Sequence, residues 1–305
     1  MTILVIGNAT VDLSYDVPQL PAPGETVLAR TKLIDAGGKG LNQAVVARRA
    51  GANVVYCAPI GRDLAAGVIV ERLEREGLAT RYLQRVCAAT DESLIFVALT
   101  GENAIVSTAA AAHSFDQVAA ASAFDGLDTN DLLLMQGNLS RASTAWCLEQ
   151  ARGRRMRTIV NPAPIAFEYG QLWPSIDIAV VNEVESEALT GLDDPAVAAE
   201  ALRRAGAQIV VTTLGALGAH LTDDRGDRYF PAPQVEAVDT TGAGDVFCGI
   251  LAAAIDARID LACALDWAVA AASLSVTRRG TSSAFPSQGE IEALRQTTVE
   301  RGDSR

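Results

Sequence analysis

The chain has few aromatic residues, few histidines and no closely spaced cysteine pair. Aromatic residues make up 5% of its 305 residues, and His113 and His220 have no second histidine or cysteine nearby, so a zinc site is not expected. The cysteines are odd in number and form no CxxC pair. We therefore expect small buried thiols in a reducing compartment, rather than a disulfide framework, at Cys57, Cys87, Cys147, Cys248 and Cys263.

Long apolar runs and an excess of positive charge are also missing. No apolar run reaches the ~18 residues that span a membrane. The first apolar run, Ile3–Ile6, follows no basic segment, so it predicts a buried strand rather than a signal peptide, and we expect a cytoplasmic protein. The formal net charge is −12, which is opposite to the balance of a broad nucleic-acid-binding surface. Neither a membrane nor a nucleic acid is therefore expected as a partner.

Apolar residues are nevertheless abundant, and they occur in short runs. They make up 49% of the chain, which excludes disorder, and a chain of this length can bury a full core. Several aliphatic runs are continuous rather than alternating, which is typical of buried parallel strands: Ile3–Ile6, Val54–Ala58, Leu132–Met135, Thr158–Val160, Ile178–Val181 and Ile209–Thr212. Helical patterns alternate with these runs or follow them: Leu64–Glu76, Ser143–Arg152, Pro195–Ala205, Ala243–Ala257 and Leu261–Thr277. We predict one α/β domain over residues 1–305, with a central, mostly parallel sheet flanked by helices.

Two regions interrupt the alternation of strands and helices. Residues from about 13 to 35 contain prolines and then an alternating stretch around Thr26–Ile34. Residues from about 90 to 108 contain two apolar runs, Leu94–Leu99 and Ala104–Ser107, on either side of a turn at Thr100–Asn103, which predicts a hairpin. These segments are expected to form a small β lid over the main sheet.

The first chemical motif is Gly242-Ala243-Gly244-Asp245, which comes before the apolar run Val246–Ile255. Glycines let backbone N–H groups approach a ligand, and the start of a helix favours an anion. The alternative is a glycine-rich turn whose acidic residue merely complements the helix dipole. The motif is neither a Walker A loop nor a dinucleotide-binding fingerprint.

The second motif is Gly37-Gly38-Lys39-Gly40-Leu41-Asn42-Gln43-Ala44, at the start of another helical segment. Its lysine, amide side chains and exposed backbone suit the hydroxyls of a polyol. A flexible turn with a surface lysine is the alternative.

In this order, the two motifs resemble those of the ribokinase-like (PfkB) family of carbohydrate kinases. The resemblance covers nearly the whole chain, with an NxxE motif at Asn182–Glu185, a phosphate loop at Thr213–Gly218 and the segment Val276–Gly280. It implies a ribokinase-like fold and ATP-dependent phosphorylation of a primary sugar hydroxyl, first of all D-ribose to D-ribose 5-phosphate. Another pentose, a ketohexose or a nucleoside stays an alternative acceptor, and a non-catalytic sugar- or nucleotide-binding regulator is a further alternative. The family also implies a homodimer formed through the lid.

The resemblance implies a role for each matching residue. Asp245 corresponds to the general base, and the anion hole for the transferring phosphoryl group corresponds to Gly242, Ala243 and Gly244. The implied sugar-binding residues are Thr10, Asp12, Gly38, Lys39, Gly40, Asn42 and Asn138. The implied ATP-binding residues are Asn182, Glu185, Thr213, Gly215, Gly218 and Val269, with Glu185 organising Mg²⁺ through water. A potassium ion (K⁺) is implied at Asp239, Thr241, Ser275, Arg278, Gly280 and Ala284.

Some positions depart from the ribokinase pattern. Thr10-Val11-Asp12 replaces Asn-Ala-Asp, Asn138 replaces a sugar-binding glutamate, and Ala109–Ala112 replaces Ala-Gly-Ala-Asn. Since a designed polar contact can discriminate strongly between substrates, the changes predict a different set of hydroxyl contacts. Ala284 stands where ribokinases often have a serine near the potassium ion.

Overall fold

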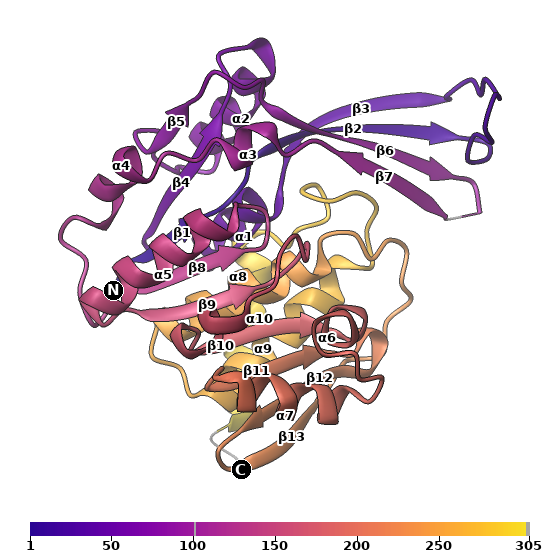
Figure 1. The fold of residues 1–305 in the computed structure, drawn as a ribbon. Helices are drawn as coiled ribbons and strands as arrows, with labels where there is room; N and C mark the ends of the chain where they lie inside the picture. The colour runs from indigo at the N-terminus through magenta and orange to yellow at the C-terminus, as the bar shows by residue number, and fades with distance from the viewer. Residues whose placement is uncertain (101, 303–305) are drawn as a thin grey trace.

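The computed structural model describes residues 1–100 and 102–302, and its largest element is a nine-stranded sheet. This main sheet has the strand order β13-β12-β11-β10-β9-β8-β1-β4-β5 (Figure 1). Its strands are β1 (Ile3–Ile6), β4 (Val54–Ile60), β5 (Leu83–Arg85), β8 (Leu132–Gln136), β9 (Arg157–Asn161), β10 (Ile178–Asn182), β11 (Ile209–Thr213), β12 (Gly218–Asp223) and β13 (Gly226–Pro231). Each aliphatic run predicted as a buried strand lies within one of them.

The main sheet is mostly parallel, as predicted. Only β12 and β13 run antiparallel to their neighbours, at one edge. Strand β1 pairs in parallel with both β4 and β8, so the chain builds the sheet outward from β1 in two directions. Ligands of open α/β sheets bind outside the carboxyl ends of the strands at such a switch point.

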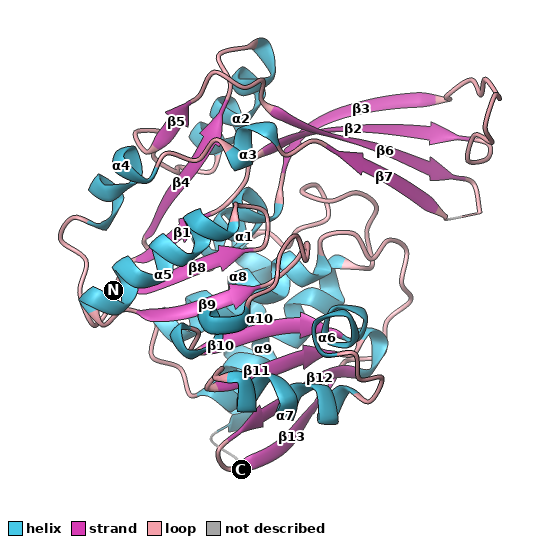
Figure 2. Cartoon of the chain, viewed as in Figure 1, coloured by secondary structure: helices cyan, strands magenta, loops and turns pink. Residues whose placement is uncertain are grey.

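Helices cover both faces of the main sheet (Figure 2). One face carries α1 (Lys39–Arg49), α2 (Leu64–Arg75), α8 (Ala243–Asp256), α9 (Leu261–Ser275) and α10 (Gln288–Gly302). The other carries α3 (Ala110–His113), α4 (Gln117–Ala120), α5 (Arg141–Arg154), α6 (Glu183–Thr190) and α7 (Pro195–Ala205). Short 3₁₀ helices are η1 (Ala121–Phe124), η2 (Gly170–Ser175) and η3 (Gly215–Leu217).

Strand β1 explains why the predicted strands are continuously apolar. Ile3 and Val5 pack into the core that contains α1 and α8, whereas Leu4 and Ile6 pack into the core on the opposite face. Because alternate side chains of a strand point to opposite faces, a strand covered on both sides needs apolar residues at every position.

The two segments that interrupt the alternation form a separate four-stranded sheet, which we call the lid. Its strands are β2 (Thr10–Val17), β3 (Thr31–Gly37), β6 (Asp91–Ala98) and β7 (Asn103–Ser107), in the order β3-β2-β6-β7. The lid extends away from the main sheet (Figure 1). The predicted alternation begins too early, because residues 26–30 are loop. Gly101, in the predicted hairpin turn, lies outside the described residues.

The prediction of buried cysteines is right for Cys57, Cys147 and Cys248. It is wrong for Cys87, which lies in the exposed loop after β5, and only partly right for Cys263, which is half-buried in α9. None of the helices within residues 1–100 and 102–302 combines the length and the apolar character needed to cross a membrane.

Candidate active site

Gly7 and Gln136 lie at the carboxyl edge of the main sheet, where the strand order reverses. Gly7 follows β1, and Gln136 is the last residue of β8. A Cβ atom on Gly7 would stand 2.0 Å from Oε1 of Gln136, so glycine alone leaves room for this side chain. Nε2 of the fully buried Gln136 donates to Oε1 of Gln43 at 2.8 Å. The switch point is thereby connected to helix α1, which carries the lysine-containing glycine motif.

Asp245 is the point where the two glycine motifs meet. It lies in the first turn of α8, and only 5% of it is exposed. Its Oδ2 accepts a hydrogen bond from Nδ2 of Asn42 at 2.9 Å, and its Oδ1 accepts one from Nε2 of Gln43 at 3.0 Å. Asn42, which the resemblance groups with the sugar ligands, therefore contacts the carboxylate of Asp245 itself.

The backbone just before Asp245 forms a site for a negative charge. Gly242 has a φ of +80°, and a Cβ atom there would stand 2.8 Å from the ring of Phe285, so this position requires glycine. Among the described residues, the backbone N–H groups of Gly242 and Gly244 find no acceptor, and that of Ala243 donates to the carbonyl of Thr240 at 3.3 Å. Free N–H groups at a helix start attract anions, so the predicted anion hole lies beside Asp245.

Lys39 brings a positive charge to the same place. Burial disfavours its ammonium form, but the negative charges of Asp245 and Glu185 outweigh burial and raise the pKa of Lys39. Lys39 therefore stays protonated at neutral pH. In a chain with a net charge of −12, it supplies part of the local attraction that an anionic substrate needs.

Asp12 lies at the base of the lid, in β2. Oγ1 of Thr10 donates to its Oδ1 at 2.8 Å, and a Cβ atom on Gly37 would stand 2.0 Å from its Oδ2. Burial raises the pKa of Asp12 to about 6, although hydrogen bonds from Thr10 and Ser93 act in the opposite direction. The negative charge of Asp245 also raises the pKa of Asp12, so the two carboxylates are close enough to repel each other.

Two further glycines let the start of α1 lie against the end of β1. Gly38 caps the helix with a φ of +95°. A Cβ atom on Gly40 would stand 2.8 Å from the backbone nitrogen of Asn8, whose side-chain oxygen accepts the N–H of Gly40 at 3.2 Å.

Asn138, in the loop after β8, has a buried Oδ1 with no hydrogen-bond partner among the described residues, so this acceptor is available to a ligand.

A cavity of about 570 Å³ opens on the other side of the anion hole. It brings together four of the predicted ATP-binding residues with two residues of the anion hole: Thr213, Gly215, Gly218, Val269, Ala243 and Gly244. Apolar side chains such as Phe247 and Val235 complete its lining. An apolar cleft that ends on free helix N–H groups suits a flat base with an anionic tail.

Asn182 and Glu185 do not line this cavity. They form a capping box at the start of α6: the side chain of Asn182 accepts the N–H of Glu185 at 2.7 Å, and Glu185 accepts the N–H of Asn182 at 3.0 Å. Nδ2 of Asn161, at the end of β9, also approaches Glu185 at 3.5 Å. Glu185 is connected to the candidate site by its negative charge, which helps to raise the pKa of Lys39.

Asp239 ties together the two loops predicted to hold a cation. Its Oδ1 accepts the N–H of Thr241, and its Oδ2 accepts the N–H of Gly280, both at 2.9 Å. Ser275, the last residue of α9, and Ala284, in the segment between α9 and α10, are both buried. The carbonyl of Ser275 accepts the N–H of Arg278 at 3.2 Å, and the guanidinium of Arg278 pairs with Glu290. Within the described ranges, no three His, Cys, Asp or Glu side chains cluster as metal ligands.

Sequence reasoning missed three residues of this site: Asn8, Gln43 and Gln136. Gln43 stands within the second glycine motif without an implied role, and Gln136 directly follows the apolar run Leu132–Met135. A buried amide directly after a continuous apolar strand is the signal that could have identified Gln136, because such a side chain needs a partner.

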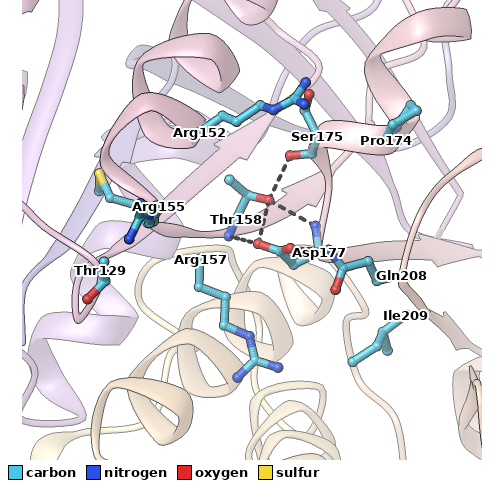
Figure 3. Close-up of a pocket in the computed structure, with 11 residues that line it drawn as sticks. Thr129, Arg152, Arg155, Arg157, Thr158, Pro174, Ser175, Asp177, Gln208 and Ile209 are labelled. Atoms are coloured by element: carbon cyan, nitrogen blue, oxygen red, sulfur yellow. Dashed lines mark hydrogen bonds between the residues drawn. The ribbon is translucent and has the colours of Figure 1, made fainter.

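A second cavity, of about 580 Å³, lies at the opposite, amino-terminal edge of the main sheet (Figure 3). Both carboxylate oxygens of Asp177 are occupied there: Oδ2 accepts from the backbone and the hydroxyl of Thr158, and Oδ1 accepts from Nε2 of Gln208. Arg152 and Arg157 extend in different directions (Figure 3). No residue predicted to belong to the site lines this cavity.

Comparison with known proteins shows the same architecture throughout the chain. The model of the pfkB family of carbohydrate kinases matches residues 2–288. A ribokinase from Haemophilus influenzae is 32% identical over 295 residues, covering 95% of this chain and 96% of that protein. A deoxyribokinase from Salmonella typhi is 33% identical, covering 94% of this chain and 96% of that protein. The crystal structure of ribokinase from Thermotoga maritima superimposes with a TM-score of 0.87 at 31% identity, covering 97% and 99% of the two chains. Arabidopsis thaliana ribokinase, complexed with ribose and ATP, gives a TM-score of 0.88 at 25% identity, covering 96% and 98%.

Proposed function

The chain belongs to the pfkB family of carbohydrate kinases, and from that premise we propose that it transfers the γ-phosphoryl group of ATP to D-ribose, forming D-ribose 5-phosphate. The family and the ribokinase-like fold were both predicted from the sequence, and both are confirmed. The observation that carries the proposal is the position of Asp245. This buried carboxylate stands beside free N–H groups and a nucleotide-sized cavity.

The reaction needs little covalent help from the protein, because phosphoryl transfer is accelerated mainly by positioning and charge stabilisation. Asp245 accepts the proton of the acceptor hydroxyl, and the freed oxygen attacks the γ-phosphorus while the bond to the β-phosphate oxygen breaks. The N–H groups of Gly242 and Gly244 stabilise the negative charge on the transferring group, and Lys39 adds a fixed positive charge. The enzyme is thus a phosphotransferase with an alcohol group as acceptor.

The sugar is assigned to the space between the lid and the switch point. Asp12, ionised above its raised pKa, would accept hydrogen bonds from sugar hydroxyls, and Thr10 would hold it in place. The unpartnered Oδ1 of Asn138 would accept another. The glycines at 38 and 40 supply close backbone approach, and Asn42 supplies the link to Asp245.

The proposal includes Mg²⁺ and a potassium ion. Glu185 is the carboxylate of the NxxE motif and would hold Mg²⁺ through water, which would neutralise ATP phosphates. Asp239 offers one carboxylate. The remaining oxygens would come from the backbone of Thr241, Ser275, Arg278, Gly280 and Ala284. A donor set of such low charge suits a large monovalent ion. Asp239 already joins the loop of Thr241 to that of Gly280, so a bound potassium ion would stiffen the turn that precedes the anion hole.

We also assign a homodimer formed through the lid. Apolar side chains on two lid strands are half-exposed or more, namely Leu33, Ile34, Ile105 and Val106. Such a sheet with exposed edges is a liability unless it is covered.

A cytoplasmic location fits the buried thiols of Cys57, Cys147 and Cys248, which are not in disulfides.

The test is a coupled ADP-release assay with a panel of acceptors: D-ribose, 2-deoxyribose, other pentoses, ketohexoses and nucleosides. We expect the highest kcat/KM with D-ribose and a strict requirement for ATP. Turnover with a nucleoside or a ketohexose in preference to every pentose would reject ribose as the acceptor. Binding of sugar and ATP without any turnover would instead support a regulator.

A further inference from the structure

Two buried amides connect the end of strand β8 to the carboxylate of Asp245. Nε2 of Gln136 donates to Oε1 of Gln43 at 2.8 Å, and Nε2 of Gln43 donates to Oδ1 of Asp245 at 3.0 Å. Both glutamines have an exposed fraction of 0%, so water does not compete for these hydrogen bonds. We call Gln136, Gln43 and Asp245 the amide relay.

The charge of Asp245 fixes the direction of the amide relay. An ionised carboxylate only accepts hydrogen bonds, so Gln43 must turn its NH₂ group towards Asp245. The carbonyl of Gln43 then faces Gln136, which must in turn present its own NH₂ group. Each amide therefore has a single orientation that satisfies its neighbour, and both orientations follow from one negative charge.

The two oxygens of Asp245 have different surroundings. Oδ1 is held by the amide relay, which runs inward to the switch point of the main sheet. Oδ2 contacts Asn42, a side chain at the start of the helix that the family resemblance assigns to sugar binding. One oxygen is therefore fixed from the core, and the other lies on the side of Asn42.

We infer that Gln43 and Gln136 are positioning residues that hold Oδ1 of Asp245, so that Oδ2 is the oxygen that takes the proton. This inference rests on the proposed kinase function. In the step concerned, the O–H bond of the sugar breaks, its proton forms a bond to Oδ2, and the electron pair left on oxygen forms the new bond to the γ-phosphorus. The bond between that phosphorus and the leaving oxygen of ADP breaks at the same time. The amide relay keeps the carboxylate plane fixed while Oδ2 changes from acceptor to donor.

Other titratable groups near Asp245 remain unchanged in the test below. Lys39 and Cys248 on the neighbouring helices and Asp12 at the base of the lid all interact electrostatically with Asp245. Glu185 acts on Lys39 from α6. A charge introduced at position 136 would also act on Asp245 through space, so a neutral variant, Gln136→Met, is measured beside the charged one. Gln136→Met removes the donor to Gln43 without adding a charge, and an acid limb that stays at the wild-type pH in this variant would overturn the inference.

The decisive variant is Gln136→Glu, which changes a side chain that does not touch Asp245. A carboxylate at this position only accepts, so Gln43 would turn its NH₂ group towards it and its carbonyl oxygen towards Asp245. Asp245 would lose a donor and face a negative dipole, so the acid limb of the kcat profile should move to higher pH by about one unit. The KM for ATP should change less than kcat at pH 6.

Gln84→Glu is the matched control, since Gln84 is also buried but bonds to the backbone of Asp116 at the far edge of the main sheet. It introduces the same charge without a path to Asp245, and its acid limb should stay within about 0.2 units of the wild type. If Gln136→Glu moves the acid limb no further than Gln84→Glu, the amide relay does not act on Asp245.

A measurement on the wild-type protein covers the case in which the variants do not fold. The side-chain NH₂ resonances of Gln43 and Gln136 should shift with pH in step with the carboxyl carbon of Asp245. Independent titration of these signals would overturn the inference. This readout does not depend on turnover, so a protein without kinase activity would reject the proposed function and still test the amide relay.

Discussion

Two cavities described above have nearly the same volume, about 570 Å³ and about 580 Å³, but they lie at opposite edges of the main sheet. At the amino edge, each carboxylate oxygen of Asp177 already accepts a hydrogen bond, Oδ2 from Thr158 and Oδ1 from Gln208. At the carboxyl edge, the N–H groups of Gly242 and Gly244 have no acceptor among the residues that the structure describes. Cavity size therefore does not distinguish the two edges, whereas unpaired donors beside a buried carboxylate favour the carboxyl edge as the candidate site.

The difference follows from how a parallel sheet is built. At the carboxyl edge strands β4, β8 and β10 lead into the starts of α2, α5 and α6, so helix N–H groups gather there, and the strand order reverses at β1. At the amino edge helices end and strands begin. Polar groups such as Asp177 and Thr158 then serve to join neighbouring strands.

The largest effect is expected for Asp245→Asn. The side chain is nearly isosteric, so packing should be preserved, but an amide cannot take the proton of the acceptor hydroxyl. We expect kcat to fall by about 10²–10⁴-fold, the range for loss of a general base. The assay is steady-state turnover beside ATP and sugar binding by calorimetry.

The matched control is Asp177→Asn at the other edge, which should keep its kcat. If Asp245→Asn retained more than about a tenth of the wild-type rate, Asp245 would be a helix-capping residue and the base would lie elsewhere.

The next effect concerns the pH dependence of sugar binding. Burial raises the pKa of Asp12 to about 6 from an ordinary value of 3.8, so protonation removes an acceptor at mildly acidic pH. We expect the KM for the sugar to rise about tenfold per pH unit once the pH is well below 6, while the KM for ATP stays flat. The raised pKa also means that this group stabilises the fold most below pH 3.8 and that its contribution is lost as the pH rises through about 6.

Asp12→Asn separates this effect from a general loss of activity in acid. Its KM for the sugar should be high at every pH, with no rise specific to acidic conditions. A wild-type KM that does not change between pH 5 and pH 7 would remove Asp12 from the sugar site.

Most of the fold that produces these two edges could be predicted from the sequence, because many of its strands and helices have a local sequence pattern. Strands buried on both faces are continuous apolar runs, and α7 shows proline at its first position and glycine at its end. Strand β13 was not predicted because most of its residues are exposed, and β12 was not predicted because its sequence, Gly218–Asp223, contains no continuous apolar run although it is largely buried. Helix α10 was also missed, because its pattern is polar and it is held by contacts such as that of Trp267 Nε1 with the carbonyl of Ile291.

The candidate site divides in the same way. Asp245 and its glycines form a contiguous motif, so a local pattern in the sequence is enough to predict them as candidates. The contact of Gln136 with Gln43 joins residues 93 positions apart, and no local pattern encodes it. Asn161, which approaches Glu185, is likewise brought there only by the order of the strands.

A smaller effect is expected for Asn138→Glu. Its Oδ1 is a buried acceptor without a partner among the described residues, at the position where ribokinases carry a sugar-binding carboxylate. A carboxylate there should strengthen one hydrogen bond to the sugar and lower the KM for ribose by about three- to tenfold. The measurement is kcat/KM over the acceptor panel with wild-type protein in parallel. A changed KM for ATP with an unchanged sugar profile would show that Asn138 lies outside the sugar site.

The smallest effect on activity is expected at the amino edge, where Asp177→Asn should leave kcat unchanged. The carboxylate accepts from Thr158 and Gln208, and an asparagine would turn an NH₂ group towards one of these donors. When that NH₂ group faces the exposed Gln208, whose own amide can turn to accept it, the buried Thr158 keeps an acceptor that has lost only its charge, so the free energy of unfolding should fall by about 0.5–1.5 kcal/mol. Urea denaturation measures this loss, and the turnover assay measures kcat on the same preparation. If kcat fell as far as in Asp245→Asn while stability held, the amino-edge cavity would take part in catalysis, and the contrast between the two edges would be wrong.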